Sequence, residues 1–348
     1  MRSISLAPEV EAAMKAAELY PLRFREVLKE KVWGGNRLKT FLGKELPKGV
    51  RIGESWEITC REHEMSEVRE GPWQGASLRD ILRARPREIL GDRVVAKYDD
   101  RFPLLLKVID AQDTLSLQVH PHDEYASRSE SEGYGKVEAW HVLHAEPRSK
   151  IVRGLLPGTT QHEFIRLLSA NRVSDCLNWV EVQSGDTVFL PPGTLHALGK
   201  GILAAEVQQN SDVTYRVHDW GRMDLDGRPR QTHLARAMQV IDFVSMGRTK
   251  CRPIVLDLYG YRREILVKCE KFCLEMLEWT GKITETENRS HFHLLFIASG
   301  SGEMYHGPGM KQRAHFQKGY SFLVPAHLGD YQLVASGGAR VLKAYPQY

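Results

Sequence analysis

Runs in which apolar and polar residues alternate fill most of the chain beyond residue 20, and glycine or proline separates them. The clearest runs cover residues 51–58, 115–119 and 136–140, while residues 102–109 form a more continuously apolar run. Alternation with a period of two places successive side chains on opposite faces of a strand. Because glycine and proline mark turns between such runs, the pattern predicts a mainly β fold.

A few segments have helical character instead. Residues 158–168 predict an amphipathic helix, in which Thr160 and Glu163 are spaced as a capping box. We expect a second helix over residues 173–179, and residues 234–243 also have a helix-like pattern. These helices are expected to cover strands rather than to carry chemistry.

The order of the elements divides the chain into three parts. Residues 1–20 are rich in strong helix formers and predict a short helical lead-in. Residues 21–247 predict a first β-barrel, which a helical insertion interrupts at about residues 158–180. Beyond a loop-like boundary, residues 254–348 repeat the same order of short strands and glycine-rich turns, which predicts a second barrel.

Composition limits the possible partners. At 348 residues, with 42% hydrophobic and 26% charged residues, the chain is large enough for two or three domains. Its 48 basic and 44 acidic residues leave a formal net charge of +4 without a basic block, so we expect no nucleic-acid partner. No run of eighteen apolar residues occurs, so we expect neither membrane spanning nor export. Five scattered cysteines favour reduced thiols and a cytoplasmic location.

Four side chains in the first predicted barrel have the chemistry of metal ligands. Gln118 and His120 lie two residues apart in one alternating run, so they project from the same face of a strand. Glu138 lies in the next alternating run, and His196 follows a tight Pro-Pro-Gly corner. Two imidazoles, a carboxylate and an amide oxygen suit a catalytic divalent ion, since zinc takes nitrogen and oxygen ligands.

Each of these features has a simpler explanation when it stands alone. A single histidine at a strand end is usually a hydrogen-bonded structural residue, and a single glutamate is usually solvated or ion-paired. The corner alone marks a turn. Residues 185–196, however, follow the spacing Gly-x5-Pro-x-Gly-x2-His without a mismatch. This segment resembles the second signature of the cupin family, which implies two cupin-like jelly-roll barrels with a few inserted helices.

The first cupin signature departs from its usual form and narrows the choice of family. Gln118 stands where the first histidine is usual, and a polar insertion over residues 121–135 separates His120 from Glu138. Gln-x-His-Pro, Lys-x-Glu, Pro-Pro-Gly-x-x-His and residues 209–216 together resemble class I phosphomannose isomerases. Further similarity to that family is found in residues 53–57 and 102–107, and it is looser in the last hundred residues.

The resemblance implies a site as well as a fold. It implies one zinc ion per chain, bound by Gln118, His120, Glu138 and His196. His122 would be a bystander, because Pro121 ends the alternation of the strand before it. The family also implies an active-site role for Arg216 and roles in proton handling for Lys136 and Glu206. Taken alone, Arg216 suits a surface ion pair and Lys136 a solvated strand residue.

The implied activity is the interconversion of mannose 6-phosphate and fructose 6-phosphate through an enediol. A divalent ion offsets the charge that develops on the two substrate oxygens, and a positioned base typically contributes about 10²–10⁴-fold in rate. Glu206 is the first candidate for this base and Lys136 is the second. Arg216 would stabilise the developing oxyanion or anchor an anionic group, and the sequence leaves both roles open.

Other functions remain open at this point. The protein could be a cupin isomerase for another sugar phosphate, or an iron-dependent oxidoreductase that uses His120, Glu138 and His196 as its triad. It could also be a cupin that binds a sugar without turning it over. His291-x-His293 in the second barrel parallels the first signature, but no glutamate follows at a suitable spacing, so we expect that barrel to be a structural partner. The sequence leaves the oligomeric state open.

Overall fold

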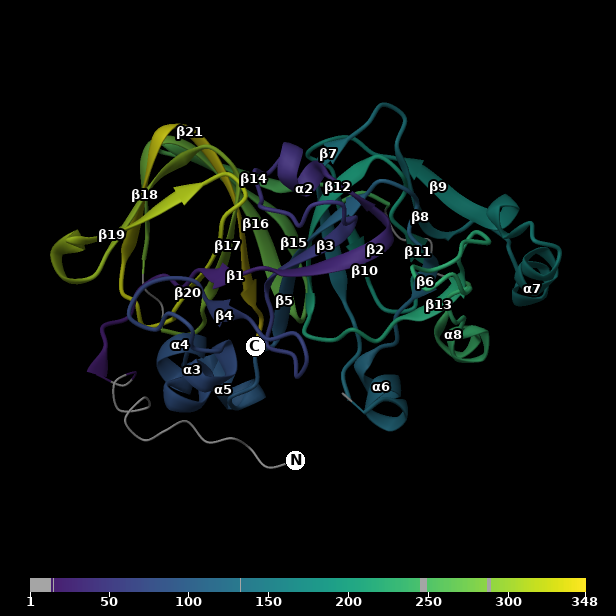
Figure 1. Cartoon of the computed structure of the whole chain (residues 1–348), viewed down its shortest axis with the longest axis horizontal. Helices are drawn as coiled ribbons and strands as arrows, with labels where there is room; N and C mark the ends of the chain where they lie inside the picture. Colours follow the sequence, from purple (N-terminus) through teal and green to yellow (C-terminus); the bar gives the residue numbers. More distant parts are fainter. Residues whose placement is uncertain (1–13, 15, 132, 245–248, 287–288) are drawn as a thin grey trace. The chain divides into compact units, whose positions relative to one another are not determined.

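Strands make up most of the elements, so the prediction of a mainly β fold is confirmed (Figure 1). The structure is a computed structural model that describes residues 14, 16–131, 133–244, 249–286 and 289–348. Most of the helical lead-in predicted for residues 1–20 lies outside the described residues. Within the described residues, no helix combines the length and the apolar character needed to cross a membrane.

Contacts divide the chain into two compact units. Unit 1 comprises the described residues of Met1–Val27, Trp56–Leu106 and Pro253–Tyr348. Unit 2 comprises the described residues of Leu28–Ser55 and Lys107–Arg252. The sequence prediction placed all of residues 21–247 in one barrel, whereas these contacts group the second segment of unit 1 with the carboxyl-terminal part. The predicted domain boundaries therefore stay a prediction.

Unit 2 contains most of a six-stranded sheet in the order β10-β7-β12-β5-β3-β2. Its strands are β2 (Val27–Gly35), β3 (Ile52–Ile58), β5 (Leu104–Ala111), β7 (Glu138–Ala145), β10 (Thr187–Leu190) and β12 (Ile202–Gln209). Every residue of β3, β5 and β12 is buried. Burial on both faces explains why β5 is mostly apolar, apart from Lys107 and Asp110, where an exposed strand would alternate.

The second sheet of unit 2 has the order β13-β6-β11-β8-β9. Its strands are β6 (Leu117–Val119), β8 (Lys150–Leu155), β9 (Leu177–Glu181), β11 (His196–Ala197) and β13 (Tyr215–His218). One face packs with helices α7 (Gln161–Ser169) and α8 (Leu234–Val240), so that Leu117 and Val119 lie in one hydrophobic core with Phe164. On the other face, Ile151 packs with Trp140 of the six-stranded sheet. The two sheets therefore enclose an interior between them.

The helical insertion predicted for residues 158–180 is only partly helical. Thr160 accepts a hydrogen bond from the backbone N–H of Glu163 at 3.1 Å, so the predicted N-cap of α7 is confirmed. The prediction of a helix over residues 173–179 is wrong. A short 3-10 helix, η1 (Val173–Cys176), is followed directly by β9, in which Trp179 pairs with Val152. Pairing with β8 outweighs the local helical preference.

Unit 1 contains a small sheet, three short helices and a larger sheet. The small sheet pairs β1 (Phe24–Arg25) with β4 (Glu67–Val68), and the helices are α3 (Leu78–Ala84), α4 (Pro86–Leu90) and α5 (Asp92–Tyr98). The larger sheet has the order β14-β15-β16-β21-β17-β20, with β18 and β19 beside β21. Its strands are β14 (Ile254–Leu258), β15 (Tyr261–Lys268), β16 (Phe272–Glu285), β17 (His293–Ser299), β18 (Ser301–His306), β19 (Gln312–Gln317), β20 (Ser321–Val324) and β21 (Tyr331–Pro346).

The jelly-roll sheets of both units have open edges. In the described part of the chain, the order of paired strands ends at β10 and β2 in one sheet, and at β14 and β20 in another. The expected barrels are therefore not closed, and each core lies between facing layers of strands. In unit 1 that core includes Leu277, Phe316 and Val341, all fully buried.

Replacing Phe164 tests how strongly α7 stabilises unit 2. Phe164 is 0% exposed in the core under β6, whereas the neighbouring Ile165 on the same helix is 39% exposed. We expect Phe164→Ala to lower the free energy of unfolding by about 3–5 kcal/mol, because it removes a buried ring and leaves a cavity. Ile165→Ala, the matched control, should change it by less than about 0.5 kcal/mol. Urea denaturation measures both, and equal losses would contradict the assigned packing.

Candidate metal centre

Strand pairing brings three polar side chains to one face of the five-stranded sheet. Gln118 in β6 is paired with His196 in β11 on one side and with Arg216 in β13 on the other. Directly paired residues of antiparallel strands share a face. Leu117 and Val119 point to the opposite face and its helices, so Gln118 points into the interior between the two sheets.

The six-stranded sheet presents charged side chains to the same interior. Glu138 begins β7, and Trp140 lies two residues further along the same face, where it is paired with Glu206 of β12. Lys107 comes from β5 and places its Nζ 3.0 Å from Glu206 Oε1. Lys107, Glu138 and Glu206 are all at most 5% exposed.

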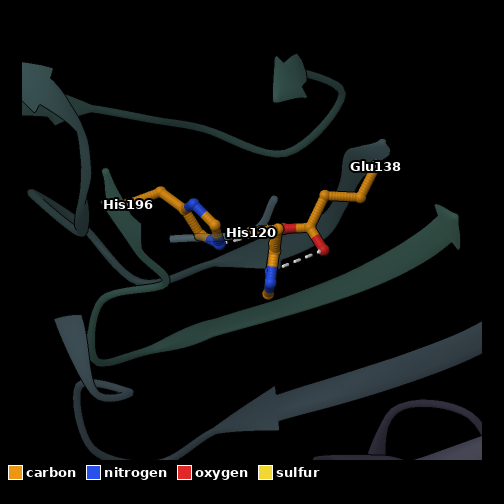
Figure 2. A group of neighbouring side chains, drawn as sticks. All are labelled: His120, Glu138 and His196. Atoms are coloured by element: carbon orange, nitrogen blue, oxygen red, sulfur yellow. Dashed lines mark ion pairs between the residues drawn. The ribbon is translucent and has the colours of Figure 1, made fainter. Parts of the chain in front are cut away.

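His120, Glu138 and His196 meet inside unit 2. Figure 2 shows the two imidazoles and the carboxylate turned toward one another. His120 Nε2 lies 3.3 Å from Glu138 Oε2, and His196 Nε2 lies 3.1 Å from Glu138 Oε1. One potential ligand atom from each residue lies within 4.8 Å of the others, and all three residues are buried. The structure therefore brings together three of the four predicted ligands.

Backbone carbonyls orient both imidazoles. His120 Nδ1 lies 2.8 Å from the carbonyl oxygen of Val213, and His196 Nδ1 lies 2.8 Å from that of Thr194. Because a carbonyl only accepts, each Nδ1 must carry the proton and donate. Each Nε2 then faces the carboxylate. Two imidazole nitrogens and a carboxylate that converge in this way match the donor set of a divalent metal ion.

Gln118 lies beside this cluster. Its side-chain amide lies 3.3 Å from His196 Nε2, with the nitrogen nearer to the ring. The amide oxygen and nitrogen exchange places when the group rotates by half a turn, so either can face the cluster. Gln118 can therefore supply the predicted oxygen, while its present contact orients His196.

Lys136 supplies positive charge at the cluster. Its Nζ lies 2.7 Å from Glu138 Oε2 and 3.2 Å from His120 Nε2. Although burial opposes ionisation, the Lys136 ammonium holds the pKa of the Glu138 carboxyl well below its usual range. Burial and the same ammonium lower the pKa of His120 to about 3. His120 is therefore neutral near pH 7, which is the form that binds metals.

Glu206 is held in a different environment from Glu138. Trp140 Nε1 donates a hydrogen bond to Glu206 Oε2 at 2.7 Å, and the Nζ of Lys136 lies 3.6 Å from Oε1. Burial and the negative charge of Glu138 raise the pKa of Glu206, and Lys107 only partly offsets this. Environments that shift two neighbouring carboxyl groups in opposite directions are typical of acid–base sites.

Sequence reasoning missed Lys107 and Trp140 as parts of the site. Lys107 has an overt signal, since it is the charged residue in the apolar run Leu104–Val108, and lysine is almost never fully buried unless it is paired. Although burial alone would lower it, the carboxylates of Glu206 and Glu54 raise the pKa of Lys107. Trp140 carries no comparable signal, because a tryptophan in a strand is usually a core residue.

Arg216 lies on the same sheet face as Gln118 and His196, and its side chain contacts a backbone carbonyl. Its Nη1 donates a hydrogen bond to the backbone carbonyl of Gln231 at 2.9 Å. Burial and the nearby charge of Arg230 lower the pKa of Arg216 from a very high usual value, so it remains a cation at neutral pH. The structure places Arg216 next to Gln118 in the sheet, and its role toward a ligand stays a prediction.

The jelly-roll layers and the inward-facing histidine–glutamate–histidine cluster define the protein as a cupin. The model described as phosphomannose isomerase type I, catalytic domain, matches residues 22–138. The model described as mannose-6-phosphate isomerase, cupin domain, matches residues 263–346. Together with the relatives described next, these matches show that the chain belongs to the type I mannose-6-phosphate isomerase family.

The relatives match nearly the whole chain. Mannose-6-phosphate isomerase ManA of Bacillus subtilis is 35% identical over 315 residues, which cover 90% of this chain and 95% of the relative. Mannose-6-phosphate isomerase of Streptococcus mutans is 33% identical over 323 residues, which cover 91% and 98%. The crystal structure of mannose 6-phosphate isomerase from Bacillus subtilis has a TM-score of 0.83 at 29% identity, with 93% of this chain and 99% of that chain covered.

Removing one hydrogen bond tests how Glu206 is held. Trp140→Phe keeps an aromatic ring, although a smaller one, but leaves Glu206 without its indole donor, so we expect a loss of about 1–3 kcal/mol in the free energy of unfolding. Trp179→Phe is the matched control, because its indole donates to Ser174 at the surface at 3.2 Å, and it should cost less than about 0.5 kcal/mol. Urea denaturation measures both variants. A Trp140 variant as stable as the control would contradict the assigned role.

Proposed function

We propose that the protein interconverts mannose 6-phosphate and fructose 6-phosphate, with one zinc ion per chain held by Gln118, His120, Glu138 and His196. The observation that carries this proposal is the convergence of His120 and His196 on Glu138 in a chain of this isomerase family. Nitrogen and oxygen donors of this kind suit zinc. When bound, such an ion would polarise the substrate oxygens as a Lewis acid.

Glu206 is the proposed base that moves the proton between the two substrate carbons. Its raised pKa brings the carboxyl closer to the range in which it can both accept and release a proton near neutral pH. Lys107 contacts one of its carboxylate oxygens and Trp140 contacts the other. These contacts fix the orientation of the carboxylate that transfers the proton. Lys136 is the second candidate, but its ammonium is engaged by Glu138 at 2.7 Å, which favours an electrostatic role.

Arg216 is proposed to bind negative charge on the substrate. A guanidinium has a planar fork of N–H donors that matches a phosphate or a developing oxyanion. Its position beside Gln118 puts it on the same sheet face as His196. The substrate is thus a small anionic sugar, and nothing in the charge of the chain favours nucleic acid. We place the reaction in the cytoplasm, which accords with five cysteines, all in the described residues, that form no disulfide.

A second candidate function uses the same metal-ligand residues with a different metal. His120, Glu138 and His196 form a two-histidine, one-carboxylate set, which also suits iron-dependent oxygen chemistry. Membership of the isomerase family favours the isomerase. Metal analysis combined with an oxygen-consumption assay separates the two activities.

Removing a ligand should remove the metal and the activity together. We expect Glu138→Gln and His196→Ala to weaken metal binding by more than about 100-fold, since even residues that only support ligands contribute about 10–100-fold. His122→Ala is the control, because His122 caps helix α6 (Asp123–Ser129) by accepting from Tyr125 N. Metal content by mass spectrometry and a coupled mannose 6-phosphate assay, with and without chelator, measure the result. Full activity in a metal-free variant would refute the proposal.

Replacing the base should separate proton transfer from metal binding. We expect Glu206→Gln to retain metal and to lower kcat by about 10²–10⁴-fold, because the amide cannot take the proton. Exchange of the substrate C2 hydrogen with solvent should fall equally. Glu181→Gln, at an exposed position in β9, should leave both unchanged. If Glu206→Gln turns over normally, Lys136 becomes the preferred base.

A further inference from the structure

Unit 1 contains a second group of buried charged side chains, which the proposed reaction does not use. Lys343 in β21 lies directly opposite Glu275 in β16, with its Nζ 3.1 Å from Glu275 Oε2. The same Nζ lies 2.6 Å from Glu285 Oε2. Arg263 of β15 forms ion pairs with both carboxylates. Lys343, Glu275 and Glu285 are at most 6% exposed, so this network lies inside the unit.

A cavity of about 380 Å³ opens onto this network. Its volume is within the range of small-molecule pockets, about 300–1,000 Å³. Thr284 and Thr286 are exposed and lie at its rim, whereas Lys343 and His293 are buried and lie at its inner end. The remaining lining residues are Tyr261, Arg263, Glu285, His291 and Tyr345. The cavity is therefore open to a ligand and polar along its depth.

The charges of the cavity balance. The cations of Arg263 and Lys343 face the carboxylates of Glu275 and Glu285 at ion-pair distance. Burial and the Lys343 ammonium lower the pKa of His291 to about 4, so its ring is neutral near pH 7. A charged ligand would leave one charge of this buried network uncompensated, which is costly. The balance therefore favours a neutral ligand.

The lining offers both donors and acceptors beside a flat aromatic wall. Lys343 and Arg263 donate, Glu285 accepts, and threonine and tyrosine hydroxyls do both. His291 stacks on Tyr345, with ring centroids 4.6 Å apart and an angle of 15° between the planes. Neighbouring hydroxyl groups of a sugar or polyol, which also donate and accept, match this pattern. A metal does not, since the metal-type cluster found among the described residues is the one in unit 2.

We infer that unit 1 binds a small neutral polyhydroxylated molecule, a sugar or polyol without phosphate, in the cavity lined by His291, His293, Glu285 and Lys343. This site is separate from the proposed catalytic cluster in its residues and in its preference for an uncharged ligand. It also gives the second jelly roll a function beyond the structural role expected from the sequence.

Calorimetric titration with unphosphorylated mannose and with sorbitol tests the inference on the full chain. The chain used in the titration carries Glu138→Gln, so that any binding signal is measured without an intact catalytic cluster. We expect saturable binding that mannose 6-phosphate does not displace. His291→Ala should weaken it about tenfold, the effect of losing one good contact. His315→Ala, half-exposed in β19 and outside the cavity, is the matched control and should leave it unchanged.

The outcomes separate this inference from the proposed catalysis. Binding that mannose 6-phosphate displaces, or that His291→Ala leaves intact, would assign the signal to another site and overturn the inference. The inference would also be overturned if neither mannose nor sorbitol bound, or if inorganic phosphate bound in their place. None of these results bears on isomerase activity, which the metal-dependent assay measures in the protein with Glu138 intact.

Discussion

The proposed chemistry depends on one contact, in which Glu138 of one sheet meets His196 of the facing sheet and His120, which directly follows β6 of that sheet. The distances of 3.1–3.3 Å require that both strand registers are correct. A shift of one residue in β6 would turn Gln118 toward the helices and Leu117 toward the interior, because side chains alternate. The hydrophobic core under α7 and α8 opposes that shift. Burial of leucine and valine on one face thus fixes the donors on the other.

The second constraint is the balance of charge in this interior. Lys107 and Lys136 face Glu138 and Glu206, and all four side chains are almost fully buried. Removing any one of them would leave an uncompensated charge away from water, which is strongly unfavourable. This explains the buried lysine in β5. It also explains why the two carboxyl groups differ, since Glu138 lies closest to an ammonium and Glu206 lies beside Glu138.

Sequence patterns predicted the parts of the site that depend on local geometry. The spacing of Gln118 and His120, and the Pro-Pro-Gly corner before His196, act over a few residues and place side chains by strand alternation. Lys107 and Trp140 contact Glu206 through sheet pairing between segments about 60 to 100 residues apart, which no local pattern encodes. The same limit explains the failed helix over residues 173–179, where pairing of β9 with β8 determined the structure.

The two units show how one fold supports different chemistry. His291-x-His293, in which His293 begins β17, resembles the first signature, yet His293 Nδ1 lies 2.9 Å from the Tyr331 hydroxyl and not from a backbone carbonyl. The nearby carboxylates are already paired with Lys343 and Arg263. In unit 2, by contrast, His120 Nε2 and His196 Nε2 each face an oxygen of Glu138. Since the two units share a jelly-roll arrangement of strands, the residues on the inner faces decide which unit suits a cation and which suits a neutral ligand.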